Sequence, residues 1–375
     1  MFTRLDLQYF KCFELLRLPL RPLTLLTGTN ASGKSSALQA LVLLHQTMRE
    51  HEWSKRLMLN GESIKLGTVL DVVDKVHGRK SFEIAIVDSE QTYSWVFTGD
   101  RDELSMEVQS VIVDQETNER PEALRYLLPP TINTSFANRL KNLTYITAER
   151  IGPREVYPLE DRQIASVVGS AGEHAVSILH WGRDEPVLDE LVMPDVINKR
   201  LYQVEARMRM FFPGCGLEVQ QVPKVNAVTL GLRTSDATDF HRPINVGFGL
   251  TQVLPIVIAA LSAAKDDILM IENPEVHLHP AGQALMGQFL AEVARAGIQV
   301  IVETHSDHVL NGIRRAVKAC RIQPEQVAVH FFRPSSAEIA QVVSPQMDGN
   351  GNIDSWPDGF FDQFDKDMNF FAGWD

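Results

Sequence analysis

The sequence predicts an α/β protein with a mixed sheet core, and three features support this. A strand, a glycine-rich turn and a helix follow one another over residues 23–48, and a strand, a helix and a strand follow over residues 267–305. Between these units, short strand-like runs separated by turn residues indicate an antiparallel β lobe. The length of 375 residues and the hydrophobic content of 44% allow a large buried core.

The elements of the amino-terminal half follow from the spacing of apolar residues. Residues 4–13 and 20–27 alternate as strands do, with Pro19 and Pro22 marking the turn between them. Residues 34–48 have the three- and four-residue spacing of a helix with one buried face. The strands of the antiparallel lobe are expected at residues 81–88, 92–100 and 105–114.

The second half is expected to be helical first and then to end in an α/β unit. Residues 172–212 are predicted to be mainly helical, and residues 217–234 to return to strands. The elements expected after them are a buried helix at 252–264, a strand at 267–272, a helix at 281–297 and a strand at 298–306. A strand, helix, strand unit makes a right-handed crossover, so the two strands are parallel and their carboxyl ends meet at one edge.

Residues 28–35, GTNASGKS, match the pattern G-x-x-x-x-G-K-[ST] between a strand and a helix. The glycines permit backbone angles that turn successive amide groups around phosphate oxygens, and the start of the helix adds partial positive charge. Lys34 is predicted to reach the β- and γ-phosphates of ATP, and Ser35 to place its hydroxyl on Mg²⁺. The predicted phosphate-binding residues are Gly28, Asn30, Ala31, Ser32, Gly33, Lys34, Ser35 and Ser36.

The apolar run ILMIE ends in an acid, Glu272, which is predicted to serve the same Mg²⁺ as a Walker B residue. Asn273 and Glu275 follow it. Because a carboxylate accepts a proton and an amide does not, Glu275 is the favoured general base, and Asn273 could only position the attacking water. The alternative interpretation of Glu275 is a charge at the start of a helix after Pro274.

The next strand ends in VETHSDH, which supplies a candidate histidine. His305 is expected to lie beside Glu272 across the sheet, where it could donate to a γ-phosphate oxygen or hold the attacking water. Glu303 and Asp307 could support it. The alternative is a zinc site, because the ends of parallel strands converge; its ligands would be His277, His279, His305 and His308.

A second glycine motif, NVGFGLTQ at residues 245–252, opens the helix expected next. Its glycines, a threonine and the free amides of a helix start form a second anion site. The predicted nucleotide contacts here are Gly247, Gly249 and Gln252. A chain with one P-loop has a use for two such sites only if they face each other between two copies, and the alternative is an ordinary glycine-rich helix cap.

These motifs resemble those of ABC-type ATPases of the SMC, RecF and OLD-like group, in particular the short stand-alone bacterial AAA-type ATPases without a coiled coil or a nuclease domain. The resemblance covers residues 1–48 and 245–308. In the family's order, LTLLTGTNASGKSS is similar to Walker A, NVGFGLTQ to the signature, IENPEVHLHP to Walker B with the D-loop, and ETHSDH to the switch histidine. It implies a P-loop NTPase of the ABC-ATPase head type, with a mixed sheet core, an antiparallel β lobe and a helical subdomain.

The resemblance also implies a homodimer in which each signature caps the ATP bound by the other subunit. Three features depart from the family's pattern. Ala31 stands where a glycine is common, and Asn273 stands at the position of the catalytic glutamate, which implies slow turnover or the use of Glu275. The glutamine of the family's Q-loop is not found, and Arg150 or Arg154 in ITAERIGPR is the expected replacement.

We expect one ATPase head over residues 1–375, without coiled-coil arms, because no sustained heptads lie between the P-loop and the signature. Too few residues follow the switch histidine for a nuclease domain. The expected parts are a nucleotide-binding core with the β lobe at 1–160 and 245–345, a helical and β insertion carrying the signature side at 161–244, and a tail at 346–375.

The tail begins with DGNGNIDSWPDG, which starts like a calcium-binding loop. Gly359 stands where such a loop needs a bidentate glutamate, so a turn is expected instead. The aromatic and acidic residues that follow, 359–374, could pack on the body or bind a partner.

Composition limits the classes of partner. The net charge of −12 repels nucleic acid overall, so DNA contact would need a local basic patch. The candidate patches, each of which could equally be a solvated surface, are residues 139–154, 199–209 and 314–321. No apolar run of about 18 residues is present to span a bilayer. The three cysteines, Cys12, Cys215 and Cys320, indicate neither a disulfide framework nor a thiolate zinc site.

The function favoured by these features is an ATP-binding, Mg²⁺-dependent ATPase in the cytoplasm, whose ATP-dependent dimer, or a higher oligomer, regulates a separate effector such as a nuclease or toxin. The resemblance suggests bacterial anti-phage defence as the setting. The alternative is a RecF-like ATPase that binds DNA in repair or maintenance. A nucleotide-binding subunit of a membrane transporter fits poorly, because the amino-terminal and switch regions look SMC-like.

Overall fold

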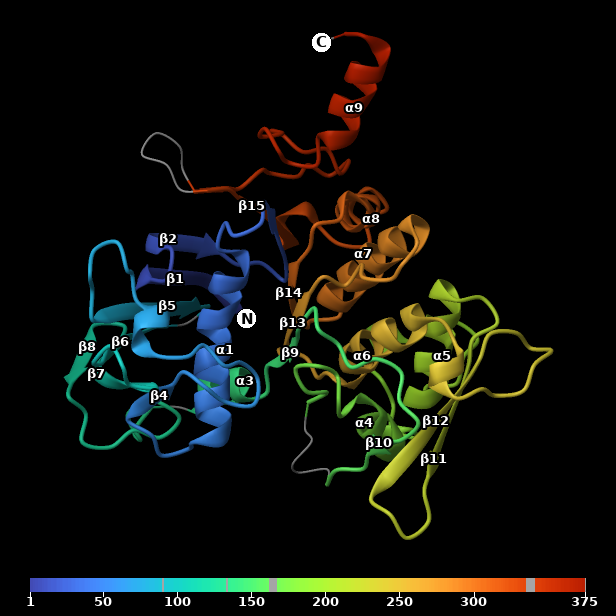
Figure 1. Ribbon diagram of the computed structural model, residues 1–375, viewed down its shortest axis with the longest axis horizontal. Helices are drawn as coiled ribbons and strands as arrows, with labels where there is room; N and C mark the ends of the chain where they lie inside the picture. Colours follow the sequence, from blue (N-terminus) through green and yellow to red (C-terminus); the bar gives the residue numbers. More distant parts are fainter. Residues whose placement is uncertain (90, 133, 162–166, 335–340, 375) are drawn as a thin grey trace.

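The computed structural model describes residues 1–375 except residues 90, 133, 162–166, 335–340 and 375 (Figure 1). The described chain forms three sheets. A central sheet runs through the middle of the molecule, with an antiparallel β lobe on one side and a group of helices on the other (Figure 1). A three-stranded sheet lies at the far edge of the helical side.

The central sheet places the motif strands side by side. Its strands are, in spatial order, β16 (Val342–Val343), β15 (Val327–Phe332), β3 (Leu23–Gly28), β14 (Gln299–Glu303), β13 (Ile268–Glu272) and β9 (Thr144–Ile146). All neighbours are parallel except the last pair at the edge, β15 and β16, so the expected mixed sheet is confirmed. The strand that carries Glu303 therefore lies between the P-loop strand and the strand that carries Glu272.

The antiparallel lobe is also present as expected. Its strands, in spatial order, are β2 (Phe13–Pro19), β1 (Phe2–Phe10), β5 (Ser81–Asp88), β6 (Thr92–Thr98), β7 (Ser105–Val113) and β4 (Arg56–Met58), and β8 (Glu116–Glu119) also pairs with β7. The expectation of one strand over residues 4–13 is wrong. The chain turns at Lys11, which has a φ of 51°, and folds back as the β1–β2 hairpin.

Helices cover both faces of the central sheet. Among them are α1 (Lys34–Glu50), α6 (Phe248–Ser262), α7 (Pro280–Arg295) and α8 (Asp307–Lys318). Adjacent residues of β3 face opposite cores: Leu25 packs with the cluster that includes α6 and α7, and Leu26 with the cluster that includes α1 and the β lobe. The P-loop strand is thus buried on both faces, which holds its carboxyl end in place. Among the described residues, no helix has both the length and the apolar character needed to cross a membrane.

The signature side is less helical than predicted. Within residues 172–212 the structure has α4 (Ala175–Gly182), a short 3-10 turn η1 (Asp189–Leu191) and α5 (Arg200–Phe211), with irregular chain between them. Arg200 at the start of α5 is 9% exposed and its Nε donates to the carbonyl of Leu261, so packing against α6 fixes this irregular region. The small sheet consists of β10 (Tyr157–Pro158), β12 (Ala227–Arg233) and β11 (Gly216–Gln221).

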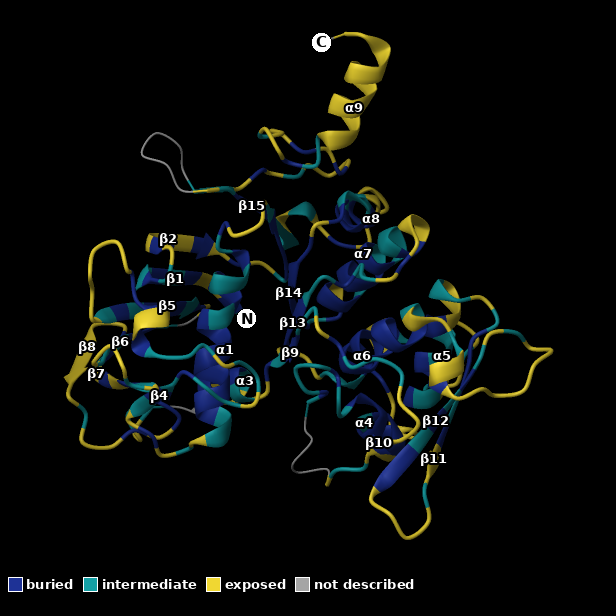
Figure 2. Ribbon diagram, viewed as in Figure 1, coloured by how far each residue is buried: buried dark blue, intermediate teal, exposed yellow. Residues whose placement is uncertain are grey.

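The remaining elements are short or terminal. They are α2 (Val69–Val72), α3 (Thr134–Lys141), the 3-10 turns η2 (Pro243–Asn245) and η3 (Pro324–Gln326), and α9 (Gln363–Ala372). The last helix projects from the body, and it is exposed along its whole length (Figures 1 and 2). The DGNGN segment forms a turn, because Asp348 accepts hydrogen bonds from the backbone amides of Asn350 and Asn352.

Candidate nucleotide-binding site

The P-loop joins β3 to α1 in a conformation that requires glycine at two positions. Gly28 has a φ of 137°, and a Cβ placed there would lie 1.9 Å from the carbonyl oxygen of Phe332 on β15. Gly33 has a φ of 105°, and its Cβ would lie 2.6 Å from the ring of Phe13. Ala31 also has a positive φ, 59°, which costs an alanine about 1 kcal/mol. The loop therefore keeps a strained conformation in which its amides surround a cavity.

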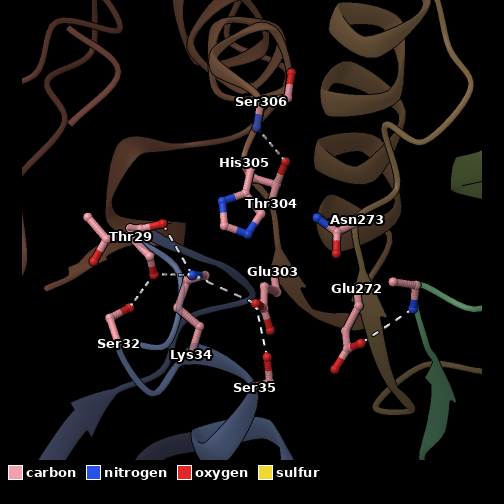
Figure 3. Close-up of polar contacts among 12 residues, drawn as sticks. Thr29, Ser32, Lys34, Ser35, Glu272, Asn273, Glu303, Thr304, His305 and Ser306 are labelled. Atoms are coloured by element: carbon pink, nitrogen blue, oxygen red, sulfur yellow. Dashed lines mark hydrogen bonds and ion pairs between the residues drawn. The ribbon is translucent and has the colours of Figure 1, made fainter. Parts of the chain in front are cut away.

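Lys34 is the cation of this cavity. Its side chain is 3% exposed, and its Nζ donates to the carbonyl oxygens of Gly28 at 3.1 Å and Thr29 at 2.7 Å (Figure 3). Burial lowers the pKa of Lys34, and the nearby carboxylate of Glu303 opposes that shift. Ser32 supports the same turn, because its hydroxyl donates to the Thr29 carbonyl at 2.7 Å.

Glu303 is the acid in direct contact with the P-loop. Its Oε1 accepts a hydrogen bond from Ser35 Oγ at 3.1 Å and lies 3.9 Å from Lys34 Nζ (Figure 3). Its Oε2 is buried and has no hydrogen-bond partner. Burial raises the pKa of Glu303 to about 7, and repulsion from Glu272 adds to the rise. From the sequence alone Glu303 was predicted only to support His305, although it ends an apolar strand in the same way as Glu272.

Glu272 faces the neighbouring strand rather than the P-loop in this structure. Its Oε1 accepts from the hydroxyl of Tyr145 on β9 at 2.7 Å, and its Oε2 accepts from the backbone amide of Ala148 at 3.3 Å. Burial and the Glu272 charge raise the pKa of Tyr145, which stays protonated and donates. Glu272 pairs with Glu303 in the register of β13 and β14, so the two carboxylates stand on neighbouring strands at the same level of the sheet.

The expected position of His305 is corrected by the strand register. Glu272 pairs with Glu303 across the sheet, so Glu303 and not His305 lies beside Glu272. The backbone N–H of His305 instead donates to Glu275 Oε1 at 3.0 Å. The imidazole of His305 is exposed toward the P-loop cavity, above Lys34 (Figure 3), and burial together with the Lys34 charge lowers its pKa. Asp307 has an ion-pair contact with His308, at 3.7 Å.

Glu275 and Asn273 form one hydrogen-bonded unit. Asn273 Nδ2 donates to Glu275 Oε1 at 3.3 Å, and Asn273 has a φ of 44°. Glu275 Oε2 is buried and has no hydrogen-bond partner. The alternative of a helix-start charge at Glu275 is wrong, because the following helix begins at Pro280 and residues between them form a turn. Glu275 thus keeps one oxygen for a group other than its protein neighbours.

Arg150 joins this unit to the signature helix. Its guanidinium donates to the carbonyl oxygens of Glu272 at 2.8 Å and Asn273 at 2.7 Å, and the residue is 7% exposed. Its own carbonyl accepts from the side chain of Gln252 on α6 at 3.4 Å. Burial lowers the pKa of Arg150 to about 10, and Glu275 opposes that shift. Of the two arginines expected to replace the Q-loop, Arg150 lies at the site, whereas Arg154 is exposed.

Gly247 and Phe248 of the signature motif lie at the surface, whereas Gln252, which was also predicted to contact the nucleotide, is buried at 4% exposure. Gly247 caps α6 and is exposed, and Phe248 is 51% exposed. Gly249 is required, because its Cβ would lie 2.9 Å from the carbonyl oxygen of His277. The cavity holds about 350 Å³, and its described lining is Cys12, residues 30–36, Glu303 and His305. No signature residue belongs to that described lining.

Comparison with known proteins agrees with this geometry. Residues 23–311 match the family described as AAA domain, putative AbiEii toxin, Type IV TA system. The chain belongs to this AAA family. Residues 322–369 match a second family, described as a protein of unknown function (DUF3696). No curated protein matches the chain.

Solved structures show the fold of this AAA-family protein. An SMC head bound to the C-terminal winged-helix domain of ScpA matches with a TM-score of 0.54 and 14% identity, over 92% of this chain and 97% of that one. An SMC head with an extended coiled coil, bound to the C-terminal domain of ScpA derived from Pyrococcus furiosus, matches with a TM-score of 0.54 and 13% identity, over 99% and 98%. The expected P-loop ATPase fold of the SMC-head type is confirmed.

The site of the AAA-family protein fits a magnesium nucleotide. Ser35 and Glu303 offer oxygen atoms next to Lys34, and Glu272 stands on the neighbouring strand in register with Glu303. Two buried carboxylate oxygens, Glu303 Oε2 and Glu275 Oε2, have no hydrogen-bond partner. Such atoms are costly to bury unless a ligand, an ion or water completes them.

The predicted zinc alternative has no support in the described residues, where no group of three or more possible metal ligands is found. His279 accepts from the amide of Ala281 and caps α7, and His277 packs against the ring of Phe248 at 5.4 Å between centroids. Both histidines therefore have structural contacts of their own.

Several arginines of the three candidate basic patches form ion pairs within the chain. Arg139 pairs with Asp88, and Arg209 pairs with Glu205. Both Arg207 and Arg321 pair with Glu292, at 2.7 and 3.0 Å. These arginines bind other parts of the same molecule, which weakens the prediction of a DNA surface there.

Proposed function

We propose that this protein is a Mg²⁺-dependent ATPase that dimerises head to tail around ATP and thereby controls a separate effector. The observation that carries the proposal is that the P-loop and the signature motif of one chain lie apart. The P-loop cavity has its lysine and the unpaired carboxylate oxygen of Glu303, while the signature motif opens on the surface and is absent from the described lining of that cavity. Two copies arranged head to tail would complete two such sites.

In the proposed site, Lys34 and the amides of the P-loop bind the β- and γ-phosphates. Ser35, with Glu272 and Glu303, would hold Mg²⁺, which when bound supplies positive charge against the phosphate oxygens. His305 lies above Lys34, where it can donate to a γ-phosphate oxygen or hold water.

Glu275 is the proposed general base. A water molecule attacks the γ-phosphorus, its proton passes to Glu275 Oε2, and the bond to the β,γ-bridging oxygen breaks to release ADP. Asn273 and the His305 amide hold the other oxygen of Glu275, which aims the free one. Because an amide occupies the position next to Glu272, turnover is expected to be slow.

The effector part of the proposal is supported by the family description, which names a putative toxin of a type IV toxin–antitoxin system. We propose a nuclease or toxin as the separate effector, anti-phage defence as the setting, and the cytoplasm as the location. The RecF-like alternative of DNA binding has less support, because several arginines of the candidate patches, Arg139, Arg207 and Arg321, are paired within the chain.

The deciding experiment is sedimentation of the full chain with Mg²⁺ and a non-cleavable ATP analogue, compared with Mg²⁺ and ADP. A dimer with the analogue and a monomer with ADP is the expected result. A monomer under both conditions would overturn the proposal. Retention on duplex DNA that depends on both ATP and salt would favour the RecF-like alternative over effector control.

A further inference from the structure

The helix α9 presents an apolar stripe with no cover. Phe364, Met368 and Phe371 are spaced by four and three residues, so they lie on one face, and they are 71%, 52% and 80% exposed. No residue of α9 is buried, and the helix projects from the body (Figure 2). Exposed apolar faces of this kind mark interaction surfaces in soluble proteins.

The base of α9 is anchored beside the nucleotide cavity. Phe360, just before the helix, is fully buried and packs on Phe331 of β15 at 5.4 Å between ring centroids. Residues 359–366 contribute Gly359, Phe361, Asp362, Gln363 and Lys366 to a second cavity of about 270 Å³, which Thr27, Gly28 and His305 complete. The apolar helix therefore starts at the P-loop half of the site.

A second exposed apolar surface surrounds the signature motif. Phe248, Ile244 and Val156 are 51%, 47% and 50% exposed. They belong to one surface, because Glu155 pairs with Arg242 at 3.1 Å and the backbone at Gly152 lies against the Phe248 ring. We call this surface, formed by Val156, Ile244 and Phe248 with Arg154 and Arg242, the signature-side patch.

The two surfaces have opposite charge. Residues 354–375 hold six aspartates and one lysine, and that lysine, Lys366, is paired with Asp358 and Asp362. The signature-side patch has two exposed arginines, Arg154 and Arg242, and Arg242 is paired with Glu155, so Arg154 is its available cation. An acidic apolar helix and an apolar surface with an available arginine are complementary in both respects.

We propose that the α9 stripe of one copy docks on the signature-side patch of a second copy when the two copies close around ATP. This inference rests on the head-to-tail dimer proposed above, which brings the P-loop half of one copy to the signature half of the other. Since α9 starts beside the P-loop and the signature-side patch surrounds the signature motif, closure of the dimer brings α9 of one copy to the patch of the other copy. The tail then strengthens the ATP-dependent dimer.

The test is the dissociation constant of the full-length dimer, measured by sedimentation with Mg²⁺ and the non-cleavable analogue. Phe364→Ser combined with Phe371→Ser should weaken the dimer by about 10-fold or more, as truncation of buried aromatic anchors does. Ile244→Ser should weaken it in the same way. Leu104→Ser, which changes a side chain of the β lobe that is 63% exposed, is the matched control and should leave the constant unchanged.

Charge reversal tests the pairing itself. Asp365→Lys alone and Arg154→Glu alone should each weaken the dimer, and the two together should recover most of the loss. A wild-type protein that stays monomeric with the analogue would overturn the proposed function. If the wild-type protein dimerises and the dissociation constant does not change in the α9 and patch variants, only this inference is overturned. The apolar stripe of α9 would then be assigned to binding a different protein.

Discussion

The P-loop half and the signature half of the site differ in how far one chain completes them. Lys34, Ser32 and Glu303 are buried and hydrogen-bonded to one another or to the loop, so the first half is assembled within a single copy. Gly247 and Phe248 are exposed, and Gln252 in the second half is buried and donates to the carbonyl oxygen of Arg150. The chain therefore forms its own phosphate-binding loop, whereas no signature residue belongs to the described lining of that cavity.

The largest effect is expected from Lys34→Ala. Removing the cation on the β- and γ-phosphates should weaken ATP binding and lower turnover by about 1,000-fold. Calorimetric titration with ATP and a phosphate-release assay measure the two effects. Lys80→Ala, on the β lobe with a side chain 66% exposed, is the control. Normal hydrolysis by Lys34→Ala would mean that the P-loop half is not the catalytic centre.

Glu275→Gln should slow the chemical step by about 100-fold while ATP affinity is kept, because the variant retains hydrogen bonding but cannot accept the proton. Asn273→Ala should have a smaller effect, since Asn273 orients Glu275 without accepting a proton. The rate of single-turnover hydrolysis, measured for Glu275→Gln and for Asn273→Ala, compares the two effects. If both variants hydrolyse ATP at the wild-type rate, the base lies elsewhere.

The proposed role of Glu303 and Glu272 in holding Mg²⁺ is tested by the dependence of turnover on the Mg²⁺ concentration. Glu303→Gln and Glu272→Gln should each raise the Mg²⁺ concentration for half-maximal turnover by about 10-fold, as loss of an oxygen ligand or of its support does. A magnesium titration at saturating ATP gives the value. Glu292→Gln, which removes an acid far from the P-loop cavity, is a suitable control, and a shift of the same size in that variant would contradict the assignment.

Arg150→Ala tests the connection between the two halves. The variant loses the hydrogen bonds to the carbonyl oxygens of Glu272 and Asn273 and the packing beside Gln252. Because Glu272 and Asn273 are then less well positioned, turnover should fall by about 10-fold. The ATP dissociation constant should change little, because Lys34 and the P-loop amides are untouched. Arg154→Ala, the exposed neighbour, should keep wild-type turnover at protein concentrations that saturate the dimer; the reverse order of effects would assign the connection to Arg154.

The smallest effect concerns the stability of the nucleotide-free protein. The folded-state pKa of Glu303 is about 7, above its ordinary value of 4.5, so the folded state keeps a proton that the unfolded state releases. The free energy of unfolding should therefore fall as the pH rises through that window, by about 1 to 2 kcal/mol. Glu303→Gln should remove this fall, which thermal unfolding near pH 5 and pH 8 can measure. A wild-type fall that persists in the variant would exclude Glu303 as its cause.

Much of the fold was predictable from local pattern. The P-loop, the helix after it, the antiparallel strands and the parallel unit at 267–305 are confirmed, because each depends on spacing within one short segment. The β1–β2 hairpin was missed, because Lys11 is a non-glycine residue with positive φ and gives no turn signal. The irregular chain before α5 was missed because its packing on α6 involves residues far away in sequence.

The motifs themselves identified the family of this chain and the residues around its phosphate-binding loop, because each motif specifies the backbone conformation of one short segment and the charged side chains that it carries. Which acid meets Ser35, which arginine joins Walker B to the signature helix, and where the tail emerges were not encoded locally. The order of strands in the central sheet determined them: β14 inserts between β3 and β13, so Glu303 stands between Ser35 and Glu272. That order reflects the packing of two separate cores on one sheet, which no short segment specifies alone.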